Sequence, residues 1–369
     1  MDAPGERKCY RDMVATVREK LANFPENSYI RMALTSDRLE EIAKRIETDR
    51  IEDLKLGYWP PLFLFLYRRS ISEIRAFEYD IDFVVRQSNR KRAREITQFL
   101  KAKPRDDRLW TAGLFETFVK SRLLKERGLT AELDYPLPNG RDTDIRLEIK
   151  NKPLYLECTA ITESDEDRKV WDRFLAAKKT DPKTILVRPG KFDLPDSKDR
   201  PPLLYYDSLR FYAKVYDKIA KNLDPRKSQM SEDGPNVLLI SFYSFRGPIS
   251  PTSPGVGWAL DELLADQPKG GARLKDYPPG ITDISLLAWL DFYANELDSK
   301  SCLDLDSYYK DFEEIVAAPR KIGAILLFET CSFKTSRVNY NAKESSRLSH
   351  HEIAELEKLL EAPPVWCRQ

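Results

Sequence analysis

The sequence predicts an α/β fold, in which a mixed sheet flanked by helices follows an all-helical N-terminal domain. Two observations indicate the sheet: apolar and polar residues alternate along residues 141–159, and residues 236–242 and 322–328 are continuous apolar runs typical of buried strands. A third observation, apolar residues recurring at helical spacing elsewhere, indicates the helices. With 369 residues and 41% hydrophobic content, we expect two domains, residues 1–105 and 106–369.

The N-terminal domain is predicted to be helical because amphipathic patterns alternate with short breaks. We expect helices over residues 6–22, 36–49, 60–77 and 81–101. Ser36 is expected to cap the second of them, and Pro60 and Pro61 suit the first turn of the third.

A further amphipathic helix is expected over residues 109–128, closed by Gly128. Glu116 lies on its apolar flank, so the helix directs this carboxylate towards whatever it packs on. The neighbours that define the flank are Ala112, Val119 and Leu123. A buried acid requires a cation or a hydrogen-bond partner. An ion pair with Lys120, four residues on, is the alternative interpretation.

Residues 141–159 are predicted to form a β-hairpin with one apolar and one polar side. A turn centred between Lys150 and Asn151 places Asp144 directly opposite Glu157. Cross-strand Cβ atoms lie about 4.5–5.5 Å apart, so two such carboxylates repel unless a cation or a shared proton lies between them. Oxygen ligands without a nearby thiolate or imidazole favour magnesium first and manganese second.

The alternative for the hairpin is a half-exposed ribbon whose acids pair with basic neighbours. Its candidate partners are Arg146, Lys150 and Lys152. The surrounding elements favour the metal-binding interpretation instead: a strand is expected over residues 130–135, and an amphipathic helix over 204–223 precedes the 236–242 run.

Near the C-terminus, Ser349 and Glu352 form a capping box that begins a helix over residues 350–361.

This order of elements, helix, three strands, helix and strand, resembles the PD-(D/E)xK nuclease superfamily, which has the restriction-endonuclease-like αβββαβ core. The matching residues are Glu116 on the helix, Asp144 at the start of the second strand, and the Glu157-Cys158-Thr159 tripeptide on the third. The resemblance implies that Asp144 and Glu157 hold a magnesium or manganese ion with the help of the Cys158 carbonyl. It also implies that Glu116 is an accessory ligand or a positioning residue.

One residue departs from the motif, because Thr159 occupies the position that is usually Lys. A lysine there orients the attacking water and offsets developing charge, which a hydroxyl does less well. The 204–223 helix offers Lys214, Lys218 and Lys221 as replacements, with Lys218 nearest the edge of its apolar stripe. The departure leaves open a catalytically inactive nuclease fold.

Charge is unevenly distributed along a chain whose formal net charge is only +1. Residues 86–108 hold nine basic residues against three acidic ones, and residues 291–314 hold eight acidic residues against two lysines. The basic segment suits contacts to nucleic-acid phosphates, with an ordinary charged helix surface as the alternative. Residues 162–203 and 246–320 are expected to be insertions in the α/β domain.

Several classes of site are poorly supported. The five cysteines have no CxxC spacing, the two histidines are adjacent, and no Gly-Lys-Ser or Gly-Lys-Thr occurs, which argues against zinc binding, a histidine-based triad and nucleotide hydrolysis. Without a signal pattern or a long apolar run, we expect a cytoplasmic protein with no membrane contact.

Together these features predict a metal-dependent nuclease; DNA is the first expectation for its substrate and RNA the second. Its expected catalytic residues are Glu116, Asp144, Glu157 and Thr159, with Asp144 and Glu157 as the metal ligands. The alternative is an inactive nuclease fold that binds nucleic acid, or an interaction module whose partner face is the acidic segment 291–314.

Overall fold

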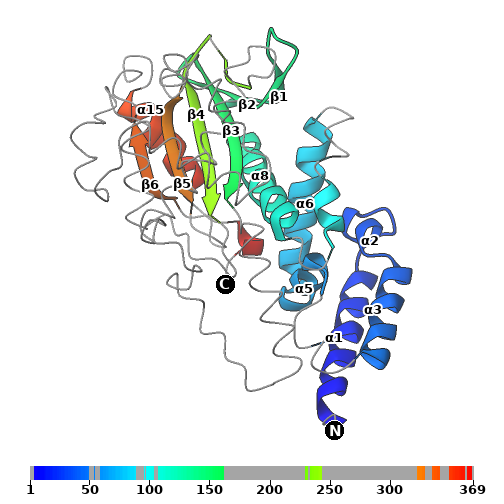
Figure 1. The fold of residues 1–369 in the computed structure, drawn as a ribbon. Helices are drawn as coiled ribbons and strands as arrows, with labels where there is room; N and C mark the ends of the chain where they lie inside the picture. Colours follow the sequence, from blue (N-terminus) through cyan, green and yellow to red (C-terminus); the bar gives the residue numbers. More distant parts are fainter. Residues whose placement is uncertain are drawn as a thin grey trace, which may run out of the picture. The chain divides into compact units, whose positions relative to one another are not determined.

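The computed structural model describes residues 4–49, 54, 59–88, 95, 97–103, 107–161, 229–231, 233–242, 322–328, 335–340, 349–361 and 364–367. These residues fall into two compact units (Figure 1). The first contains the helices up to Lys125 together with the short 3-10 helix η5 (Val365–Cys367), and the second contains the sheet and helix α15 (His350–Leu360). The expected α/β class, a helical N-terminal region followed by a mixed sheet, is confirmed.

The first unit is built from helices. Its elements are α1 (Pro4–Ala22), α2 (Tyr29–Ala33), α3 (Ser36–Thr48), α5 (Pro61–Arg68), α6 (Ile71–Gln87), the 3-10 helix η1 (Phe99–Lys101) and α8 (Asp107–Lys125). None of the helices that the structure describes is both long enough and apolar enough to cross a membrane.

The cap of α3 differs from the prediction. Thr35, not Ser36, is the N-cap, and its hydroxyl accepts a hydrogen bond from the backbone N–H of Arg38. Both residues can cap a helix, so the sequence pattern alone does not choose between them. The helix therefore spans Ser36–Thr48, and Ser36 lies inside its first turn instead of capping it.

The helices predicted over residues 60–77 and 81–101 have the wrong boundaries. Helix α5 ends at Arg68, and α6 begins at Ile71. α6 then continues without interruption through residues 78–80, the gap between the two predicted helices. Ser70 caps α6, and the Glu73 carboxylate accepts a hydrogen bond from the Ser70 backbone N–H at 2.7 Å. This capping box is a start signal that apolar periodicity does not reveal.

Aromatic side chains form the centre of the first unit. Phe77 lies within 5.0–6.3 Å, between ring centroids, of Phe99, Trp110 and Trp366. The indole N–H of Trp366 donates to the Asp80 carboxylate at 2.6 Å, so the indole's polar atom is satisfied inside the core. Trp366 is 1% exposed, and it therefore joins the C-terminal region of the chain to the N-terminal helices.

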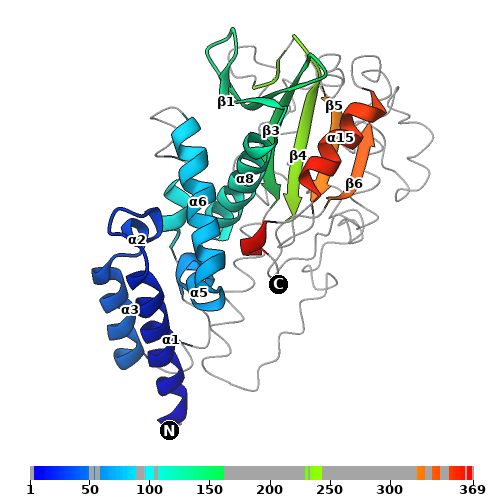
Figure 2. The same ribbon diagram turned by 180° about the vertical axis from the view of Figure 1, so that it is seen from behind.

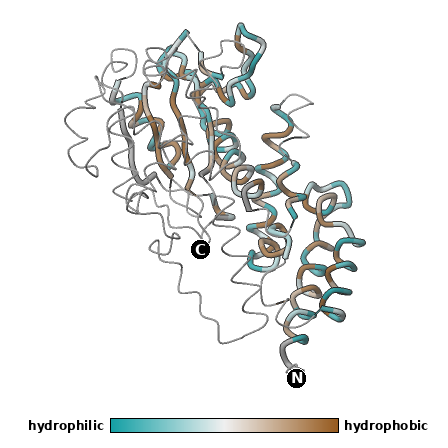
Figure 3. Tube along the Cα trace, viewed as in Figure 1, coloured by the Kyte–Doolittle hydropathy of each residue, from teal (hydrophilic) through white to brown (hydrophobic). Residues whose placement is uncertain are grey.

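The second unit is a single mixed sheet. Among the described residues its strands are β1 (Thr130–Pro136), β2 (Asp142–Ile149), β3 (Lys152–Ile161), β4 (Asn236–Phe242), β5 (Ile322–Phe328) and β6 (Thr335–Tyr340), in that spatial order. The pairs β1–β2, β2–β3 and β5–β6 are antiparallel, whereas β3–β4 and β4–β5 are parallel. Every residue of β4 and β5 is buried, and Figure 3 shows apolar residues along both strands.

Helix α15 lies on one face of this sheet (Figure 2), with Ile353, Leu356 and Leu360 buried. Its predicted capping box is confirmed by the hydrogen bonds between Ser349 and Glu352. Burial raises the pKa of Glu352, but hydrogen bonds from Ser349 and the ammonium of Lys152 outweigh it and lower that pKa overall. The 3.1 Å ion pair between Lys152 and Glu352 ties α15 to the start of β3.

Trp366→Ala is expected to lower the free energy of unfolding of the first unit by about 3–5 kcal/mol, because it empties a core position and removes the donor to Asp80. Urea denaturation followed by circular dichroism measures the change. The adjacent Val365→Ala, at an exposed position, is the control and should change the free energy by about 0.5 kcal/mol or less. Equal losses in the two variants would contradict the assignment of Trp366 to the core.

Candidate active site

The β2–β3 hairpin has the predicted turn and register. Lys150 and Asn151 have φ angles of +51° and +63°, which is the conformation of a two-residue type I′ turn. Such a turn matches the right-handed twist of the strands and fixes their pairing. The paired residues run from Ile149 opposite Lys152 to Ile145 opposite Leu156.

One step beyond the last of these pairs lie Asp144 and Glu157, both buried at 6% and 2% exposure. Here the side chains join the strands. The backbone N–H of Asp144 donates to Glu157 Oε1 at 3.2 Å, and the backbone N–H of Cys158 donates to Asp144 Oδ2 at 2.8 Å. Each carboxylate is thus oriented by an amide of the opposite strand, and the two acids lie together as the register predicts.

Thr159 follows Glu157 by two positions on β3 and therefore lies on the same face of the sheet. Its neighbour on the parallel strand β4 is Ile240, and the neighbour of Glu157 is Leu238. Thr159 is half-buried. Its hydroxyl is therefore on the face that carries the two acids, at the position expected for the motif lysine.

Glu116 lies on α8 in the first unit, whereas Asp144 and Glu157 lie in the second. Its carboxylate forms a 2.6 Å ion pair with the fully buried ammonium of Lys120. This is the i to i+4 pair that sequence reasoning gave as the alternative. A role for Glu116 beside the two strand acids stays a prediction.

Asp134, a buried acid on β1 with a φ of +49°, was not among the residues expected from the sequence. Its flanking residues pair with Thr143 and Ile145 of β2, so Asp134 interrupts the ladder beside Asp144. Aspartate is disfavoured in strands but tolerates positive φ better than most residues. That mismatch between residue type and strand pattern is the signal from which its special position could have been suspected.

The basic residues of the hairpin have carboxylate partners outside the acid pair. The Arg146 guanidinium pairs with Glu132 of β1 and lies 5.2 Å from the Tyr135 ring centroid. Burial lowers the pKa of Arg146, but hydrogen bonds to Glu132 and Tyr155 outweigh it and raise that pKa overall. Arg146 is therefore a fixed cation on the polar side of the hairpin.

The two lysines near the turn contact α15. Lys150 lies 3.3 Å from Glu355, and Lys152 forms the ion pair with Glu352. Lys150 is exposed and Glu355 is half-exposed, so that pair contributes little to stability, whereas Glu352, the partner of Lys152, is buried. Both pairs place the turn against the helix.

The donor set of the acid pair suits a hard cation. Within the ranges that the structure describes, no three His, Cys, Asp or Glu side chains gather into a group that could hold a metal ion. Magnesium, however, is usually bound through one or two carboxylates, with waters and substrate phosphates as its other ligands. Asp144 and Glu157 meet that requirement.

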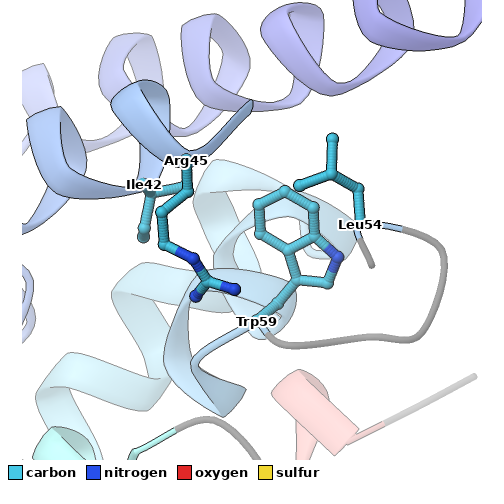
Figure 4. Close-up of a pocket in the computed structure, with 4 residues that line it drawn as sticks. All are labelled: Ile42, Arg45, Leu54 and Trp59. Carbon is cyan, nitrogen blue, oxygen red and sulfur yellow. The ribbon is translucent and has the colours of Figure 1, made fainter. Parts of the chain in front are cut away.

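The first unit contains a small cavity, separate from the acid pair of the second unit. It is lined by Ile42, Arg45, Leu54 and Trp59 (Figure 4), and its volume is about 10 Å³. A space of that size holds no more than one water molecule. It is too small to be a substrate site.

Some predicted features lie outside the described residues. They are the 204–223 helix with Lys214, Lys218 and Lys221, the insertions 162–203 and 246–320, the acidic segment 291–314, and residues 89–94, 96 and 104–106 of the basic segment.

Comparisons with protein-family models, curated proteins and solved structures gave no match to this chain.

Glu157→Ala is expected to lower the free energy of unfolding by about 1–3 kcal/mol, because it removes a buried acceptor of the Asp144 backbone N–H. Glu157→Gln keeps an acceptor oxygen and should lose less. Urea denaturation of both variants measures the difference. Glu148→Ala is the control, at a half-exposed position on the face of β2 that carries Asp144, and should lower the free energy of unfolding by about 1 kcal/mol or less. An equal loss of free energy at both sites would contradict the structural role of Glu157.

Proposed function

We propose that the protein is a metal-dependent nuclease of the PD-(D/E)xK type, which hydrolyses phosphodiester bonds. The first proposed substrate is DNA, and the second is RNA. The observation that carries the proposal is the pair Asp144 and Glu157. Two buried carboxylates on neighbouring strands, each held by an amide of the other strand, form a preorganised anionic site. Burying two such groups side by side is costly unless a cation or a shared proton lies between them, and a cation is the partner that a nuclease requires.

The order of elements supports the same proposal. Helix α8 precedes three antiparallel strands, and β4 then pairs in parallel with β3. The acids lie on β2 and β3, where the resemblance to the superfamily requires them. β5 extends the sheet with a further parallel pairing.

The chain's own residues would have distinct tasks at this site. When bound, a divalent ion supplies charge stabilisation to the phosphate in the transition state and lowers the pKa of the attacking water. Asp144 and Glu157 would hold that ion, together with the Cys158 carbonyl. The Thr159 hydroxyl would orient the water, and the two amide hydrogen bonds fix the carboxylates before substrate arrives.

The second candidate is a nuclease fold that binds nucleic acid without cleaving it. Thr159 in place of the motif lysine favours it, because no ammonium group is supplied at that position. The amide hydrogen bonds to both acids also favour it, because in this candidate the acids only join the two strands. This candidate predicts salt-dependent retention of DNA without product.

Purified protein is expected to cleave labelled DNA when magnesium or manganese is added, and to stop when the metal is chelated. Asp144→Asn and Glu157→Gln should each slow cleavage by about a hundredfold or more, because each removes negative charge that attracts the ion. Labelled RNA is tested in parallel. Glu148→Gln is the matched control and should cleave at the wild-type rate; unchanged cleavage in both site variants would remove the assignment.

Thr159→Lys is expected to raise the cleavage rate by about tenfold or more, because it supplies the ammonium group that the motif position lacks. The reason is electrostatic, so Thr159→Gln, similar in length but uncharged, should give no increase. Rates under single-turnover conditions separate this effect from substrate binding. Equal rates for the lysine and glutamine variants would sink the idea that Thr159 stands at the lysine position.

A further inference from the structure

Helix α6 carries a stripe of cationic and aromatic side chains. Arg75, Tyr79, Phe83 and Arg86 follow one another at spacings of four, four and three residues, so they share one face of the helix. Both arginines are exposed. Tyr79 is 58% exposed, more than any other large apolar or aromatic side chain among the described residues.

The two rings of the stripe are already arranged as a platform. The centroids of Tyr79 and Phe83 lie 6.1 Å apart with an interplanar angle of 20°. The ammonium of Lys125, from the last turn of α8, lies 4.5 Å from the Tyr79 centroid and 5.6 Å from that of Phe83. An ion pair with the buried Asp80 holds Lys125 there. The exposed Tyr79 ring is therefore held in place before any partner binds.

Arginines at the two ends of the platform offer contacts to a polyanion, on a helix that also carries Glu73, Glu78, Asp80 and Asp82. Arg86 is paired with Asp82 at 2.8 Å, whereas Arg75 forms no ion pair with any residue that the structure describes. The two arginines lie about 16 Å apart along the helix axis. In the sequence that follows Arg86, residues 87–108 hold eight basic residues against three acidic ones.

We propose that this stripe, Arg75, Tyr79, Phe83 and Arg86, binds single-stranded nucleic acid. A base would stack on Tyr79 while the flanking phosphates contact Arg75 and Arg86. A duplex is disfavoured because its bases are stacked on one another and offer no free ring face. The inference rests on the proposed function for taking nucleic acid as substrate, and it adds the strandedness that the acid pair does not determine.

Anisotropy of fluorescein-labelled 20-nucleotide oligo(dT), oligo(U) and a 20-base-pair duplex tests the proposal on the full chain. EDTA is present throughout, so that binding is measured without cleavage. The wild-type protein should bind a single strand more tightly than the duplex, and Tyr79→Ala should weaken single-strand binding by about fivefold or more. Arg75→Gln and Arg86→Gln should each reduce the slope of log affinity against log salt by about 0.7.

Matched controls are available in the first unit. Tyr67→Ala removes another exposed tyrosine, and Arg18→Gln removes an exposed cation from α1. Both should bind as the wild type does. Wild-type affinity in Tyr79→Ala, or tighter binding of the duplex, would overturn the proposal.

Failure of this inference is distinguishable from failure of the nuclease proposal. Cleavage that depends on Asp144 without any effect of Tyr79→Ala on binding would overturn the stripe alone. Tyr79-dependent binding without metal-dependent cleavage would support the stripe and overturn the nuclease.

Discussion

The two-residue turn at Lys150 and Asn151 is the constraint on which the candidate site depends. A two-residue type I′ turn permits only one register, and that register brings Asp144 and Glu157 together. Side chains alternate between faces, so a slip of one residue would send either acid to the opposite face of the sheet. The site is therefore specified by a turn about six residues away from it, whose two central side chains are exposed.

Strand β3 connects the hairpin to the rest of the sheet in the second unit. On one side it pairs antiparallel with β2, and on the other it pairs parallel with the fully buried β4. The acids consequently lie where an open, partly polar hairpin meets an apolar sheet. Such a boundary gives a carboxylate low solvent exposure together with nearby backbone amides, which is why Asp144 and Glu157 can be both buried and hydrogen-bonded.

Features encoded by local pattern could be predicted from the sequence. Alternation along the hairpin predicted its register, continuous apolar runs predicted β4 and β5, and the Ser349 capping box predicted the start of α15. At Ser70 two local signals compete, the apolar periodicity and the capping box. The periodicity continues across this position, so it did not predict the break between the two helices. The special backbone of Asp134 depends on the neighbouring strand. The burial of Trp366 depends on residues almost 300 positions earlier, and no local pattern encodes that contact.

The contact between Trp366 and Asp80 also makes the first unit discontinuous in sequence, since all the described strands of the sheet lie between the two contacting residues along the chain. During synthesis on a ribosome, the helices emerge long before the indole that completes their aromatic centre. The sheet has the opportunity to fold while that centre is still open, so the N-terminal helices should reach their final packing last.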